Sequence, residues 1–156
     1  KIGLGNYCDF WMHNGLMEDS EGKLSKSRGE RITLEEVFTD CPPPALRFYL
    51  LGFHYRDFTP YSPEGLLEAC QEGERLGVNA VDCMVVEPTD PREDEETAPL
   101  VTKFEDALSD DLDTPRTLDV LRELDVIAGN RLKNKGDIGP ISGMYSIFQC
   151  VLGVFS

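Results

Sequence analysis

The sequence lacks the features that would place it in a membrane or on an export pathway. Its 156 residues include no apolar run that approaches the roughly 20 residues of a membrane-spanning helix. The N-terminal segment has no basic stretch before an apolar one and no small-residue cleavage site, so it is not a signal peptide. It also does not begin with Met, which fits a piece of a longer chain. We therefore expect no membrane contact.

Metal-binding and disulfide patterns are missing too. The five cysteines show no C-x-x-C spacing, and His13 and His54 have no close Cys partner at zinc-finger spacing. An odd number of widely scattered cysteines argues against a disulfide framework and favours a reducing compartment. We therefore predict no metal site in this chain, a cytoplasmic location, and cysteines that fill small spaces in the core.

Positive charge is scarce and unevenly placed. The chain has 15 Lys and Arg residues against 29 Asp and Glu residues, a net charge of -14. The first 61 residues hold seven basic and nine acidic residues, so residues 62–156 carry 12 of the 14 net negative charges. The acidic part would repel a phosphate backbone. Any contact with a polyanion should therefore come from residues 1–61.

Local patterns in the first part predict one short strand and two helices. Residues 10–17 (FWMHNGLM) are aromatic and apolar and lead into a polar turn, which indicates a strand followed by a loop. Thr33 and Glu36 form a capping-box pattern that should start a helix, and the prolines of 41–44 should end it. Residues 45–55 are apolar almost all round, so we expect a helix buried on most sides, with Arg47 and His54 on one face.

The second part has the pattern of an antiparallel helical bundle. Ser62 and Pro63 should start a long helix that continues to about Val86. Residues 87–99, with three prolines and a run of acids, are predicted to be an exposed or disordered linker. Further helices are expected at about 99–109, from the cap at Thr114-Pro115 with Leu118, Leu121 and Leu124 in the core, and at 141–155. The prediction is thus a mainly α protein, with a strand and loop region at 1–61 and a bundle domain at 62–156.

The loop after the predicted strand contains the sequence KLSKS at 23–27, followed by Arg28. Two lysines three residues apart can close over a triphosphate and balance the charge that moves onto departing pyrophosphate. Small Ser residues let the backbone approach and add hydroxyl donors. On spacing alone, however, a solvated surface turn is the better explanation, because short motifs match by chance.

The sequence on either side of KLSKS favours the first explanation, in which the lysines bind a triphosphate. KLSKS resembles the KMSKS signature of class I aminoacyl-tRNA synthetases, with Leu24 in place of Met. The ordered set FWMHNGLM, KLSKS, ITLEEV, ALRFYLLGFHYR, YSPEGLLEA and FEDALSDDLDTPRTLDVL is similar to the cysteinyl-tRNA synthetases over nearly the whole chain. This family activates cysteine with ATP to an enzyme-bound adenylate and then transfers it to tRNA-Cys.

The resemblance implies roles for individual residues. Lys23 and Lys26 would be the catalytic lysines, with Lys26 closest to ATP, and Ser25 and Ser27 would join them in binding ATP. Mg²⁺ would accompany ATP. The family's zinc ligands and first nucleotide-binding motif would lie upstream of Lys1, so we expect this chain to be inactive alone, and we expect a monomer.

Several other residues allow two interpretations. Arg28, Arg31 and Arg56 are candidate tRNA contacts, with ordinary solvated charges as the alternative. His54 and Tyr55 fit the packing of a helix end better than a site. Trp11 and His13 either neighbour the ATP site or belong to the core. The acids Asp110, Asp111 and Asp113 are interpreted as a turn rather than a metal loop.

Two alternative functions stay open. A cysteine–amino-sugar ligase of mycothiol synthesis would share the signature loop and bundle but would not use tRNA. A non-catalytic relative that only binds a partner would fit the acidity of residues 62–156, although the retained Lys23 and Lys26 argue against it.

Overall fold

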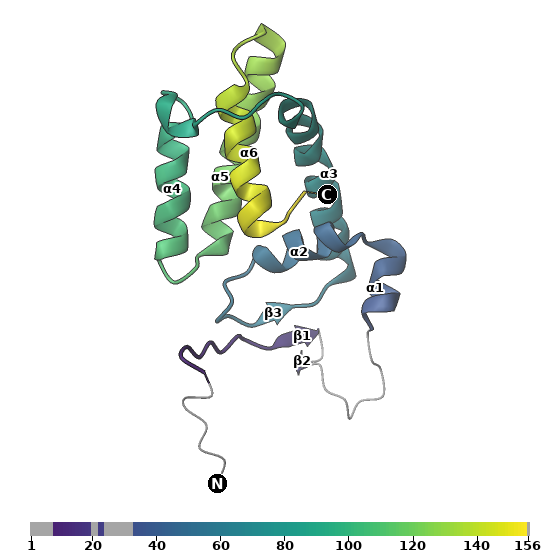
Figure 1. Ribbon diagram of the computed structural model, residues 1–156. Coiled ribbons are helices and arrows are strands. Elements are labelled where there is room, and N and C mark those ends of the chain that lie inside the picture. The colour runs from purple at the N-terminus through teal and green to yellow at the C-terminus, as the bar shows by residue number, and fades with distance from the viewer. Residues whose placement is uncertain (1–7, 20–21, 24–32, 156) are drawn as a thin grey trace.

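The computed structural model describes residues 8–19, 22–23 and 33–155. An upright bundle of helices stands above a small sheet, with the short helix α2 between them and α1 to one side (Figure 1). The helices are α1 (Leu34–Asp40), α2 (Pro43–Leu51), α3 (Pro63–Met84), the 3-10 helix η2 (Pro91–Glu93), α4 (Ala98–Ser109), α5 (Thr114–Asn134) and α6 (Gly139–Leu152). The strands are β1 (Met17–Asp19), β2 (Gly22–Lys23) and β3 (Thr59–Pro60). The predicted mainly α class, with a strand region followed by a helical bundle, is confirmed. No helix among the described residues is long and apolar enough to cross a bilayer.

Two helix starts are confirmed in atomic detail. The Thr33 hydroxyl accepts from the Glu36 amide at 3.3 Å, and the Glu36 carboxylate accepts from the Thr33 amide at 2.8 Å. This is the reciprocal capping box, which satisfies two amides that have no partner inside the helix. At α3, the Ser62 hydroxyl accepts from the Gly65 amide at 3.0 Å, and Pro63 occupies the first helical position.

Other boundaries differ from the predictions. β1 covers only Met17–Asp19, so of the strand predicted at 10–17 only Met17 has strand structure. α2 begins two residues early, because prolines fit the first turn, where their missing amide costs no hydrogen bond. It ends at Leu51, so Arg47 and His54 do not share a helix face. At α5 the cap is Asp113, whose carboxylate accepts from the Arg116 amide at 3.1 Å, rather than Thr114.

Residues 87–99, predicted to be an exposed or disordered linker, are exposed at most positions but are not disordered. The segment is an ordered crossing from α3 to α4 over the end of the bundle (Figure 1), with Thr97 fully buried. Pro91 starts η2, and Pro99 lies in the first turn of α4. The Arg131 guanidinium lies 2.7 Å from an Asp94 carboxylate oxygen and lowers the pKa of that carboxyl. Acidic and proline-rich composition therefore did not mean disorder here, because Asp94 and Glu96 both meet Arg131 of the bundle.

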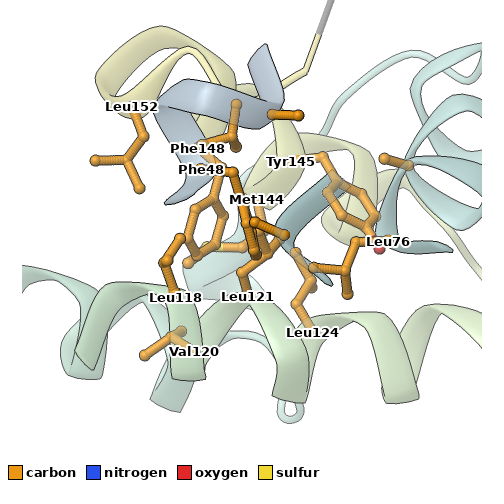
Figure 2. Close-up of a cluster of buried hydrophobic side chains, with 14 of the residues drawn as sticks. Phe48, Leu76, Leu118, Val120, Leu121, Leu124, Met144, Tyr145, Phe148 and Leu152 are labelled. Carbon is orange, nitrogen blue, oxygen red and sulfur yellow. The ribbon is translucent and has the colours of Figure 1, made fainter. Parts of the chain in front are cut away.

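The core lies between α3, α5 and α6 (Figure 2). Leu118, Leu121 and Leu124 are buried on one face of α5, as their spacing predicted. Phe148 of α6 is fully buried and meets the ring of Phe104 edge-on, with the ring centroids 4.8 Å apart. Phe48 of α2 belongs to the same cluster, so the region before residue 62 is fixed to the bundle by apolar packing. This packing gives the sheet at the base of the bundle a rigid support.

The cysteines divide into two groups. Cys41, Cys70 and Cys83 are buried, as predicted for core fillers, whereas Cys8 and Cys150 are exposed. The Cys70 thiol lies 3.2 Å from the sulfur of Cys41. Burial raises the pKa of Cys83 to about 11 and also raises the pKa of Cys41. Since the thiolate is the reactive form, the buried group should be chemically inert in the folded protein.

We expect a thiol-specific reagent such as dithionitrobenzoate to modify Cys8 and Cys150 rapidly at pH 8. The three buried thiols should react only after unfolding, because burial keeps the reagent away from all three and a raised pKa further suppresses the thiolate forms of Cys41 and Cys83. The measurement is the absorbance of released thiolate in buffer and in guanidinium chloride, with mass-spectrometric mapping of the modified residues. Rapid modification of Cys70 or Cys83 in buffer would contradict the packing.

Candidate functional site

The three strands form a sheet in the order β2-β1-β3, and this sheet bears the start of KLSKS. β1 pairs antiparallel with β2, which places Lys23 opposite Glu18. β3 pairs parallel with β1, with Met17 opposite Thr59. Lys23 is therefore two strands away from the segment that follows α2. We call β1 and β2 together the signature hairpin.

Most of the sequence-predicted site residues lie outside the described residues. These are Ser25, Lys26, Ser27, Arg28 and Arg31. The backbone of Lys23 is described as part of β2. On the other side of this segment the described chain resumes at Thr33, where the capping box fixes the start of α1. The structure thus fixes both attachment points of the KLSKS segment.

A close backbone approach holds the start of the signature hairpin against the segment after α2. The Gly15 amide donates to the Tyr55 carbonyl at 2.6 Å, and the Thr59 amide donates to the Leu16 carbonyl at 3.0 Å. A Cβ at Gly15 would lie 1.8 Å from the Asp57 carbonyl oxygen, so only glycine fits there. The Tyr61 amide continues the ladder by donating to the Glu18 carbonyl. The hairpin and residues 55–61 therefore form one hydrogen-bonded unit.

The segment between α2 and β3 also contacts the helical bundle. Three consecutive side chains, those of His54, Tyr55 and Arg56, converge on Asp111 in the turn between α4 and α5. The Arg56 guanidinium donates from Nε at 2.6 Å and from Nη2 at 3.0 Å to the two carboxylate oxygens. The Tyr55 hydroxyl donates to the same carboxylate at 2.7 Å, and His54 Nε2 lies 3.1 Å from the Asp111 carbonyl oxygen. The guanidinium also lies over the Tyr55 ring, 5.1 Å from its centroid.

These donors stabilise the charged form of the carboxylate. The Arg56 guanidinium, and after it the Tyr55 hydroxyl, lower the pKa of Asp111 to about 2. A carboxyl whose pKa falls on folding stabilises the folded state above its unfolded pKa of about 4, and the benefit is lost as the pH falls through about 2. The contacts of Asp111 should therefore be intact throughout the neutral and mildly acidic range.

The geometry changes the interpretation of several residues. Arg56 is a candidate tRNA contact whose guanidinium is already engaged by Asp111. His54 lies beyond the end of α2 and contacts the turn after α4. Trp11 is 69% exposed and its ring stacks near that of His13, 6.5 Å between centroids, so Trp11 is not a core residue.

The acidic turn at 110–113 is not a metal loop among the described residues, because its carboxylates have protein partners. Asp110 pairs with Arg116 at 3.3 Å, Asp111 pairs with Arg56, and Asp113 caps α5. No group of three or more His, Cys, Asp or Glu side chains in the described ranges is arranged to hold a metal.

Sequence reasoning missed the roles of Asp111 and Gly15. One signal was available for Asp111: three donor side chains in a row after an apolar helix require an acceptor, and paired aspartates in a turn are an obvious one. No local pattern indicated that Gly15 must approach the Asp57 carbonyl, because that contact depends on how β1 pairs with β3.

Comparison with known proteins bears on the same region. Residues 2–71 match the family model described as the tRNA synthetases class I (C) catalytic domain. The chain is 35% identical over 138 residues to a cysteine–tRNA ligase of Shewanella sp. (strain MR-4), which covers 88% of this chain and 28% of that protein. It is 33% identical over 153 residues to the cysteine–tRNA ligase of Paenarthrobacter aurescens, covering 96% of this chain and 31% of that protein. A similar match to the cysteine–tRNA ligase of Methylococcus capsulatus has 34% identity over 119 residues, 76% of this chain and 25% of that protein. The chain thus spans about a quarter to a third of the length of these relatives.

Proposed function

The chain belongs to the cysteinyl-tRNA synthetase family, and we propose that it is the part of a cysteine–tRNA ligase that bears the signature loop and the adjoining helical bundle. The main support is the match of the family across both parts of the chain, with KLSKS placed between a hairpin and a capped helix. In this proposal residues 1–61 end the catalytic domain and contain the stem-contact region, and residues 62–156 form the bundle domain.

The proposed reaction has two steps. ATP and cysteine first form cysteinyl adenylate and pyrophosphate, and the cysteinyl group then passes to the 3′ end of tRNA-Cys. Lys26, with Lys23, neutralises the charge that develops on the departing pyrophosphate, which is the kind of electrostatic stabilisation that accelerates such a step most. Ser25 and Ser27 donate to the phosphates. Mg²⁺ accompanies the nucleotide.

Zinc enters no step that we assign to this chain. In the family the metal selects the cysteine thiol, and we place its ligands upstream of Lys1. The residues that the structure describes offer no cluster with which to replace them. We further propose that the enzyme is a cytoplasmic monomer, and that Arg28, Arg31 and Arg56 face the acceptor stem of the tRNA.

The full-length gene product should charge tRNA with cysteine in an ATP-dependent reaction, whereas residues 1–156 alone should form no cysteinyl adenylate. The measurements are incorporation of labelled cysteine into tRNA and cysteine-dependent exchange of pyrophosphate into ATP. Exchange without charging would instead favour a ligase that uses an amino sugar. Absence of both exchange and charging would favour the interpretation as a non-catalytic binding module.

A further inference from the structure

We propose that Asp111 is a positioning residue, which acts with His54, Tyr55 and Arg56 as a clamp that sets the signature hairpin in place against the helical bundle. The inference rests on the proposed function, because it concerns where Lys23 is held during adenylate formation. The word clamp refers below to these four residues.

The clamp differs from an ordinary surface ion pair. A single exposed pair between charged side chains contributes little to stability. Here the guanidinium of Arg56 donates to both oxygens of the Asp111 carboxylate. The Tyr55 hydroxyl donates to one of the same two oxygens. The planar guanidinium also stacks over the Tyr55 ring, which further restricts its orientation. Three hydrogen bonds therefore fix one carboxylate in both distance and direction.

The backbone at Asp111 supports a positioning role. Asp111 and Leu112 both have left-handed conformations, with φ of 55° and 57°. Aspartate tolerates this region better than most residues, but leucine does not, so the turn stores backbone strain. Such strain persists only where the surroundings enforce it, and it is found most often at functional sites. Hydrogen bonds from the Leu112 and Asp113 amides to carbonyls of α4 hold the turn in this form.

A continuous set of contacts joins the clamp to Lys23. Tyr55 accepts from the Gly15 amide through its carbonyl while its hydroxyl binds Asp111. Further along the same segment, the amides of Thr59 and Tyr61 donate to the carbonyls of Leu16 and Glu18. Glu18 lies opposite Lys23 in the hairpin. Because hydrogen bonds and strand pairing connect the turn to the hairpin, movement at the turn should move the hairpin with it.

Lys23 needs accurate placement if it stabilises a departing phosphate. A displacement of about 1 Å in a catalytic group can reduce the rate on the order of 10²-fold. The clamp residues lie outside the three strands of the sheet, and none of them is assigned a contact with ATP or cysteine. The effect of the clamp should therefore fall on the step that uses the lysines, adenylate formation, and not on binding of cysteine.

The test is Asp111→Asn in the full-length protein, with Asp110→Asn as its matched control. Asparagine also tolerates the left-handed conformation, so this change removes the charge without new backbone strain. Asp110 lies in the same turn but pairs with Arg116 and does not contact the clamp. For Asp111→Asn we expect cysteine-dependent pyrophosphate exchange to fall about 10-fold, with a raised KM for ATP and an unchanged KM for cysteine. Arg56→Lys keeps the positive charge but cannot donate to both carboxylate oxygens at once. It should lower pyrophosphate exchange by less than Asp111→Asn does.

A second measurement does not depend on enzyme activity. Amide hydrogen exchange at Gly15, Thr59 and Tyr61 should be faster in Asp111→Asn than in the wild type, while amides of α5 and α6 should be unchanged. If the wild type shows no pyrophosphate exchange, the proposed function fails, and hydrogen exchange alone decides whether the clamp holds the hairpin. Unchanged hydrogen exchange would overturn the clamp. An effect on the KM for tRNA alone, or a lower Tm with unchanged kinetics, would overturn its positioning role.

Discussion

Replacing Lys26 with Ala in the full-length protein is expected to lower cysteine-dependent pyrophosphate exchange by about 10²–10³-fold. This range is the usual cost of removing one well-placed group that stabilises charge in a transition state. The effect should be mainly on kcat, because the interaction strengthens as negative charge moves onto pyrophosphate. The KM for cysteine should change little, since the lysine is assigned to the phosphates.

The two steps of the reaction give this prediction an internal control. Transfer of cysteine from preformed adenylate to tRNA no longer involves pyrophosphate, so its single-turnover rate should be nearly the same in Lys26→Ala and wild type. Lys103→Ala is the matched control for loss of a lysine: Lys103 pairs with Glu123 on the exposed faces of α4 and α5. Its activity should be unchanged, because an exposed ion pair contributes at most about 1 kcal/mol. A loss of less than fivefold for Lys26→Ala would contradict the assigned role.

The sequence predicted those parts of the structure that depend on neighbouring residues. The capping box at Thr33 and the cap at Ser62 are local hydrogen-bond patterns, and both are present. The leucines of α5 follow from the helical period, which needs only the knowledge that one face is buried. The same reasoning identified four helices in the second part of the chain.

The failures share a physical cause, which is dependence on distant residues. Residues 87–99 resemble a disordered linker until Arg131, more than 30 positions away, binds Asp94 and Glu96. Asp111 similarly resembles an ordinary turn residue until Arg56 and Tyr55, 55 and 56 positions away, donate hydrogen bonds to it. Charge composition describes an isolated segment, whereas ion pairs depend on which segments the core brings together.

Phe148→Ala should destabilise the folded chain by about 3–5 kcal/mol, the usual cost of removing a fully buried aromatic ring. The ring packs edge-on against Phe104 and lies in the cluster that joins α2 to the bundle (Figure 2). Its loss leaves a cavity that the surrounding helices can close only in part. Since domains are stable by about 5–15 kcal/mol in total, the variant should be close to the limit of folding.

Urea unfolding followed by circular dichroism measures this change, with two variants on the same helix as controls. Val151→Ala removes methyl groups from a half-exposed position and should change the free energy of unfolding by less than about 0.5 kcal/mol. Tyr145→Phe removes a buried hydroxyl that has no hydrogen-bond partner among the described residues, so it should be neutral or stabilising. If Tyr145→Phe were instead as harmful as Phe148→Ala, its hydroxyl would need a partner, and the packing around α6 would differ from the one described. If Phe148→Ala cost less than about 1 kcal/mol, the ring could not be the centre of the core.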